Sequence, residues 1–225
     1  LKAMSVLRVD IGWLANSRNN SIVDFGLSKS AEETFEFWDK KYTIQRMIRI
    51  VRAYKPDIII PTFLDVEGQH GHHRAVTKAT IEAFDNSNDP EIFPDDNFGP
   101  WKISQIFLPA WSGGGGSYDD EEDPPEATHF IQVGNYNHIF GGTYNQIGEW
   151  SRSYHATQNI GKLAYEDKMD VPLHLLKGKY VDGDITGGVI PKNFLELSNF
   201  AINENGKKVL QECHKPVSYT HLTLP

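Results

Sequence analysis

The sequence predicts an α/β domain whose sheet is Rossmann-like, mostly parallel and flanked by helices. The main observation is an amphipathic helix, capped by Asp39 and ended by Lys55, which is followed at once by the β-branched run Asp57–Pro61. A continuously apolar run bounded by prolines is typical of a buried strand in a parallel sheet. A polar, glycine-bearing loop and a second helix come next, and this order of elements is the rhythm of an α/β fold.

The composition is that of one folded domain and argues against several classes of function. The 225 residues suffice for a single domain, and 39% hydrophobic with 23% charged residues is far from a disordered composition. A net charge of −8 without a sustained basic patch argues against a nucleic-acid partner. No apolar run approaches the ~20 residues of a membrane span. The one cysteine, Cys213, excludes a disulfide framework and a cysteine-based structural zinc site.

The first helix is defined by the spacing of its apolar residues. They follow the i, i+3, i+4, i+7 series of a helix with one buried face, and they are Ile44, Met47, Ile48 and Val51. Three arginines lie between them, and we expect all three on the solvent-exposed face: Arg46, Arg49 and Arg52. The proline after Lys55 then stops the helix.

The later elements are indicated in the same way. The second helix begins near His72, and beyond it we expect strands over Ile103–Pro109 and Thr128–Val133, a helix over Thr143–Gln158, short extended pieces over Lys177–Ile190 and a terminal helix over Phe194–Phe200. Residues 113–125 form an acidic, glycine-rich excursion between the two strands. This excursion lacks the alternating ligands and central glycine of a calcium loop, so we interpret it as a solvated loop.

The chain divides into three segments. Residues 1–21 match no element well, residues 22–200 form the α/β domain, and residues 201–225 are a tail whose end, Pro216–Pro225, is interpreted as non-native sequence. Neither Leu1 nor Pro225 looks like a natural domain border. We therefore expect a piece of a longer protein, with the first strand of the sheet upstream of this sequence.

Three of the nine histidines fall within four residues: His70, His72 and His73. They follow the carboxyl end of the predicted strand, where open α/β sheets bind their ligands. Gly71 allows a bend that can bring His70 and His73 to one cavity, and neutral imidazole suits a catalytic zinc, which takes three protein ligands and a water molecule. An accidental cluster in a polar loop is the alternative. A metallo-β-lactamase-like site is disfavoured, because Arg74 and Ala75 stand where that pattern needs aspartate and histidine.

These residues also resemble a known family. The run 52–61, followed by residues 68–76, is similar to the second signature of the PIG-L/LmbE family of zinc-dependent N-deacetylases, which act on N-acetylglucosamine-bearing substrates. Two further stretches, 24–30 and 144–158, resemble large bacterial members, and the resemblance covers residues 22–190. It implies a metal-dependent amidohydrolase with an N-acetylated sugar as substrate. The alternative is a non-catalytic carbohydrate-binding or interaction domain of the same fold.

The resemblance also implies roles for individual histidines. His73 matches a zinc ligand, and His70 matches the histidine that stabilises the tetrahedral oxyanion or donates the proton to the departing amine. His72 stands where the family usually has aspartate. It is therefore grouped with the candidates for substrate binding.

Three more residues are substrate-binding candidates. Arg74 matches the arginine of the family, with a structural ion pair as the alternative. Tyr144 and His155 match positions on a helix near the pocket, with packing as the alternative role. The first motif of the family, Ala-His-Pro-Asp-Asp-Glu, has no counterpart in residues 1–30, so we expect the remaining zinc ligands and the general base upstream of Leu1. These 225 residues alone are expected to be inactive.

Overall fold

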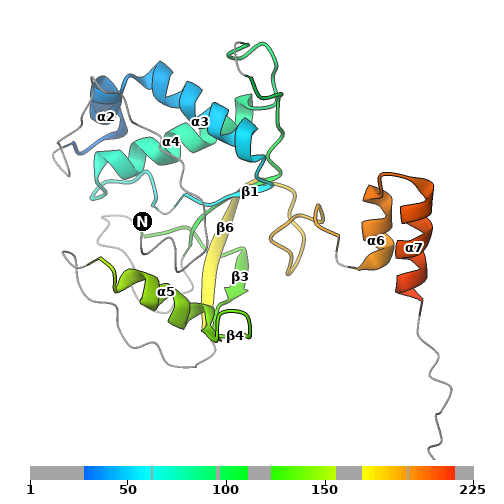
Figure 1. Cartoon of the computed structure of the whole chain (residues 1–225). Coiled ribbons are helices and arrows are strands. Elements are labelled where there is room, and N and C mark those ends of the chain that lie inside the picture. The colour runs from blue at the N-terminus through cyan, green and yellow to red at the C-terminus, as the bar shows by residue number, and fades with distance from the viewer. Residues whose placement is uncertain are drawn as a thin grey trace, which may run out of the picture.

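The computed structural model describes residues 28–61, 63–94, 97–110, 123–155, 169–191 and 193–215. The predictions for residues 1–27, for most of the acidic excursion, for the end of the helix at 156–158 and for residues 216–225 lie outside the described residues. Helices α2, α3 and α4 gather near β1, α5 lies near β4 at the far end of β6, and a pair of short helices, α6 and α7, stands apart (Figure 1).

The described sheet has four strands in the order β1 (Ile58–Ile59), β2 (Gln105–Pro109), β6 (Asp170–Gly178) and β3 (His129–Gln132). β1 pairs with β2 in parallel, whereas β6 runs antiparallel to both β2 and β3. The predicted mostly parallel sheet is therefore not found among the described strands, and a Rossmann-like arrangement is not confirmed. The mixed α/β class does hold, and a small antiparallel pair, β4 (Tyr136–Asn137) with β5 (Gly142–Thr143), completes the described strands.

Helix α2 (Ala31–Trp38) begins with a capping box. The Ser30 hydroxyl accepts from the Glu33 backbone N–H at 3.1 Å, and the Glu33 carboxylate accepts from the Ser30 N–H at 3.2 Å. Two donors of the first turn are thus satisfied by side chains, which fixes where the helix starts.

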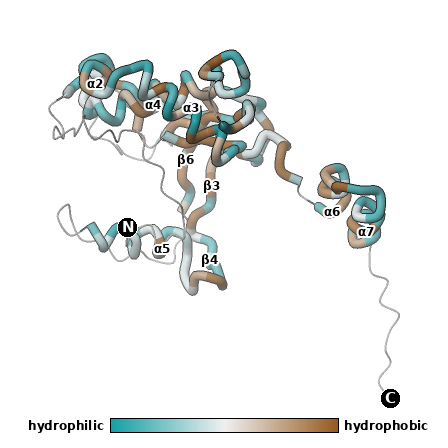
Figure 2. The backbone as a smooth tube through the Cα atoms, turned by 45° about the horizontal axis from the view of Figure 1, so that its top comes forward, coloured by the Kyte–Doolittle hydropathy of each residue, from teal (hydrophilic) through white to brown (hydrophobic). Residues whose placement is uncertain are grey.

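Helix α3 (Lys40–Tyr54) has the predicted bounds. Asp39 accepts from the Tyr42 N–H at 3.1 Å and caps the helix, and Lys55 ends it in the left-handed conformation with φ of 52°. Its apolar residues pack into the main hydrophobic cluster, whose buried members are Ile48, Val51, Ala83 and Ile103. Along α3 and α4 the colour alternates between hydrophobic and hydrophilic residues, as a one-sided burial requires (Figure 2).

Arg52 corrects the predicted solvent face of α3, because its side chain is 2% exposed. Its Nε donates to the carbonyl oxygen of Ser87 at 3.0 Å, and Nη2 donates to those of Asp89 at 2.7 Å and Ile92 at 2.9 Å. Nη1 donates to the carbonyl of Phe93 at 3.4 Å. The guanidinium thus donates hydrogen bonds to the carbonyls beyond the end of α4. These bonds replace the water molecules that would solvate the charge at the surface.

Helix α4 (Gly71–Asn86) follows β1 after one loop and packs against α2 and α3. Its inner face is made of small residues, and Ala75, Ala79 and Ala83 are fully buried. Gly71 lies against the start of α2: a Cβ there would meet the Ser30 carbonyl oxygen and lie 2.6 Å from the Thr34 hydroxyl. This close approach requires glycine.

The remaining helices are either shorter than the sequence predicts or were not predicted. α5 (Tyr144–Arg152) is capped by Thr143 and ends before the predicted bound. The terminal helix is divided into α6 (Phe194–Leu197) and a 3₁₀ turn, η1 (Ser198–Phe200), and α7 (Glu204–His214) lies in the predicted tail. No helix in the described part of the chain is both long enough and apolar enough to cross a bilayer.

Candidate functional site

The candidate site is the junction between β1 and α4, at the carboxyl end of the strand. Gly68 turns the chain with φ of 89°, and His70 then takes an extended conformation as the N-cap residue of α4. The His70 carbonyl accepts from the backbone N–H groups of His73 at 3.0 Å and Arg74 at 3.2 Å. The first turn of the helix therefore fixes how the histidines are arranged.

His70 and His73 lie next to each other, as their spacing predicts. Their ring centroids are 5.5 Å apart with an interplanar angle of 48°. Both side chains are partly buried, so they are sheltered by protein and still reachable from outside. One turn of helix thus presents two imidazoles to the same region.

The His73 ring is held on its edge and on its face. Its Nδ1 lies 2.9 Å from the side-chain oxygen of Gln69. The Phe63 ring stacks on it with centroids 3.8 Å apart and planes 4° from parallel. Sequence analysis missed both residues, because Gln69 and Phe63 lie in the loop before α4 and the spacing of the helix does not indicate their contacts.

His72 projects toward α2, away from this arrangement. Its ring stacks on Trp38 with a centroid distance of 5.1 Å and an interplanar angle of 30°. Successive residues of a helix point about 100° apart, so His72 and His73 cannot share one face. The contact is consistent with packing of α2 on α4.

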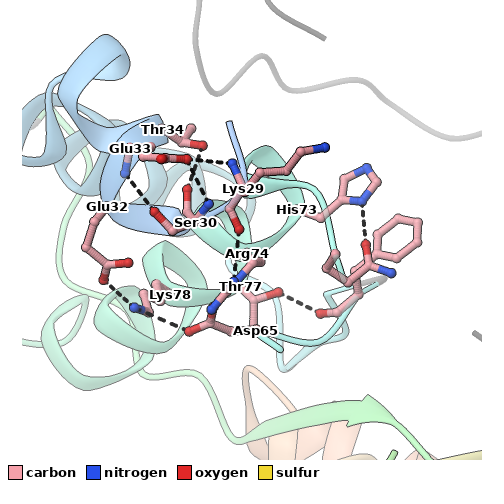
Figure 3. Close-up of polar contacts among 12 residues, drawn as sticks. Lys29, Ser30, Glu32, Glu33, Thr34, Asp65, His73, Arg74, Thr77 and Lys78 are labelled. Atoms are coloured by element: carbon pink, nitrogen blue, oxygen red, sulfur yellow. Dashed lines mark hydrogen bonds and ion pairs between the residues drawn. The ribbon is translucent and has the colours of Figure 1, made fainter. Parts of the chain in front are cut away.

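Arg74 takes part in an ion-pair network that joins α4 to α2 and to the loop after β1 (Figure 3). Its Nε contacts Asp65 at 2.7 Å, and Nη1 donates to the Lys29 carbonyl at 2.9 Å. Lys78, one turn further on, contacts Glu32 at 2.5 Å and Asp65 at 3.4 Å. These contacts match the structural alternative for Arg74.

The network shifts the pKa values of two of its members. The hydrogen bond from Lys78 lowers the pKa of the Glu32 carboxyl, and the same bond raises the pKa of Lys78. Both charged forms are therefore favoured in the folded state. The pair is largely exposed, with 67% of the Glu32 side chain accessible, so solvent weakens its contribution.

Tyr144 and His155 lie elsewhere, on α5 and just after its end. The Tyr144 hydroxyl accepts from the Asn137 side chain at 2.8 Å, and His155 Nδ1 lies 3.3 Å from the Arg152 carbonyl oxygen. Neither contacts His70 or His73 through a hydrogen bond or ring stacking, and in Figure 1 α5 lies near β4, apart from α4. Their assignment to the site stays a prediction from the resemblance.

The side chains at the junction supply only part of a metal site. The described ranges contain no group of three His, Cys, Asp or Glu side chains that could hold a metal ion. His73 nevertheless has the arrangement of a ligating histidine, because such residues donate one ring N–H to an oxygen and bind metal through the other nitrogen.

Comparison with known proteins finds a similar protein whose name states its activity. No model of a known protein family matches the chain. The chain is 30% identical over 89 residues to 1D-myo-inositol 2-acetamido-2-deoxy-alpha-D-glucopyranoside deacetylase 1 of Frankia alni. It is similar to a deacetylase. The matched part is 38% of this chain and 30% of the relative, so the chain spans less than a third of that protein.

Proposed function

We propose that this chain is part of a zinc-dependent hydrolase that removes the acetyl group from an N-acetylglucosamine-like sugar. The main support is the similarity to a deacetylase whose name contains a 2-acetamido-2-deoxyglucopyranoside. The resemblance of residues 52–61 and 68–76 to the PIG-L/LmbE signature agrees with it. The two adjacent imidazoles at the carboxyl end of β1 provide side chains suited to this chemistry.

His73 is the residue that would hold zinc. Its Nδ1 faces the amide oxygen of Gln69, so the ring would bind zinc through Nε2. A bound zinc ion lowers the pKa of a water molecule toward about 7, which supplies hydroxide at neutral pH. The Phe63 ring covers one face of the imidazole and keeps water from it.

His70 is the residue that would move a proton. The N-acetyl carbonyl carbon becomes tetrahedral when hydroxide adds, and the C–N bond then breaks to give acetate and a free amine. The His70 imidazole either stabilises the oxyanion or gives its proton to the departing amine nitrogen. Its ring lies one helical turn from His73, so one substrate amide can reach both.

The other candidate residues receive supporting roles. Arg74 positions the loop after β1 through Asp65, and His72 joins α4 to Trp38 of α2. Tyr144 and His155 remain proposed substrate contacts on the resemblance alone. No nucleic-acid partner is proposed for a chain with net charge −8.

The test is acetate release by the full-length protein that contains this sequence. The substrate is an N-acetylglucosamine-bearing sugar, and the protein is assayed after chelation and again after zinc is restored. We expect activity only with zinc, none with His73→Ala, and a loss of about 100-fold or more with His70→Ala. His214→Ala, at the exposed end of α7, is the matched control and should keep full activity.

Two outcomes would contradict the proposal. Acetate release that is unchanged in His73→Ala would exclude this residue as a required ligand. Saturable binding of the sugar with no acetate release at any zinc concentration would favour the alternative, a non-catalytic carbohydrate-binding domain.

A further inference from the structure

We propose that Gln69 is a positioning residue for His73: its amide oxygen holds the imidazole in the tautomer with the proton on Nδ1 and the electron pair on Nε2. This inference rests on the proposed function, because the tautomer matters only if His73 binds a ligand through Nε2. Nothing in the spacing of the sequence motif assigns such a role to Gln69.

The argument begins with how Gln69 is fixed. Gly68 turns the backbone with a positive φ, and the Gln69 N–H donates to the Val66 carbonyl at 3.4 Å. The Gln69 side chain is 9% exposed, so its amide lies within the protein, next to the first turn of α4. A buried amide needs partners, and the ring of His73 supplies one.

The chemistry of the contact decides the tautomer. The Gln69 side-chain oxygen lies 2.9 Å from His73 Nδ1, which is a normal hydrogen-bond distance. An amide oxygen only accepts, so Nδ1 must carry the proton in the neutral ring. The electron pair of the imidazole is then on Nε2, the nitrogen that can bind a metal.

The face of the ring is fixed separately from its edge. Phe63 stacks on His73 with planes 4° from parallel, and the Phe63 backbone carbonyl accepts from the Thr77 hydroxyl at 2.7 Å. Thr77 is one turn after His73 on the same helix. Helix α4 therefore anchors the residue that covers the ring, while the loop before the helix supplies the hydrogen bond.

The first measurement is the tautomer of His73 in the metal-free full-length protein. Nitrogen-15 chemical shifts of the ring, recorded where the imidazole is neutral, distinguish a proton on Nδ1 from one on Nε2. We expect the Nδ1–H form in the wild type and in Gln69→Glu, which keeps an acceptor oxygen. We expect loss of that form in Gln69→Met, which keeps the shape and removes the acceptor.

The second measurement is zinc affinity by competition with a chelator. Removing the hydrogen-bond partner of a ligating histidine costs about 10–100-fold in metal affinity, so Gln69→Met should bind zinc weaker by that factor. Gln69→Glu should stay close to the wild type. Gln45→Met, the same exchange at an exposed site on α3, should change neither the tautomer nor the affinity.

The outcomes separate this inference from the proposed function. A wild-type ring protonated on Nε2, or a tautomer unchanged in Gln69→Met, would overturn the role of Gln69 whatever the activity. A wild type that binds no zinc would overturn the proposed zinc chemistry, whereas the shifts would still support or reject the hydrogen bond. A folded Gln69→Met variant with wild-type tautomer and affinity would reject the inference completely.

Discussion

At the residue scale, the Arg52 guanidinium is a buried charge that needs hydrogen-bond partners within the protein. It donates to four backbone carbonyls beyond the end of α4, so its removal leaves those acceptors without their charged partner. We expect Arg52→Met to lower the free energy of unfolding by about 2–4 kcal/mol. Urea denaturation measures this, and Arg49→Met, exposed on the same helix, should stay within about 0.5 kcal/mol of the wild type. Equal stability of the two variants would contradict the buried role.

Two glycines give a second prediction at this scale. A Cβ at Gly71 would lie 2.6 Å from the Thr34 hydroxyl and 2.7 Å from the Ser28 hydroxyl, so Gly71→Ala should destabilise by about 1–3 kcal/mol. A Cβ at Gly148, inside α5, meets nothing within 4 Å. Gly148→Ala should therefore stabilise the protein by about 0.5–1 kcal/mol. Thermal unfolding of both variants compares them, and the same sign for both would refute the close approach of α2 to α4.

At the element scale, the Glu32–Lys78 pair joins α2 to α4 in a pH-dependent way. The lowered pKa of Glu32 adds stability above the ordinary glutamate pKa of 4.5, and this stability is lost as pH falls through the lower pKa of the folded state. The raised pKa of Lys78 adds stability below 10.5, lost as pH rises through the higher folded value. A double-mutant cycle with Glu32→Gln and Lys78→Met should give a coupling below about 1 kcal/mol at neutral pH. A coupling that does not fade in acid would contradict the assignment.

The helices show which elements sequence reasoning can find. α3 was predicted with its bounds because its cap, apolar spacing and stop are all local. Arg52 was misplaced because its partners lie 35–41 residues away along the chain. The prediction of a mostly parallel sheet was wrong for the same reason. β6 begins with Asp170 and contains Pro172, which are both unusual in strands, so the sequence does not indicate a strand there. Its antiparallel pairing with β2 and β3 is set by contacts distant in sequence.

In the candidate site too, local contacts could be predicted from the sequence and contacts between distant segments could not. The neighbouring rings of His70 and His73 followed from a three-residue spacing at a helix start. The stacking of Phe63 on His73 and of Trp38 on His72 depends on how the loop and α2 fold back on α4, and no periodic pattern shows it. The roles carried over for Tyr144 and His155 remain predictions, because the hydrogen bonds of these residues are made to Asn137 and to the Arg152 carbonyl and not to the histidine pair.

At the scale of the whole molecule, the described chain combines a packed α/β part with a weakly attached helical pair. α4 contains six buried residues, whereas α7 contains none, and α6 and α7 pack mainly on each other and on η1. We expect amide hydrogens of α7 to exchange much faster than those of α4, because opening α7 exposes little apolar surface. Hydrogen exchange followed by mass spectrometry tests this, and equal protection of the two helices would show that α7 is anchored more firmly than its contacts indicate.

The most direct test of the central claim is to locate zinc in crystals of the full-length protein by anomalous diffraction at the zinc edge. The account predicts an anomalous peak about 2.0–2.1 Å from Nε2 of His73, at the junction of β1 and α4, and no such peak in His73→Ala. Zinc bound through Nδ1 of His73, or zinc bound only by residues away from this junction, would contradict the account.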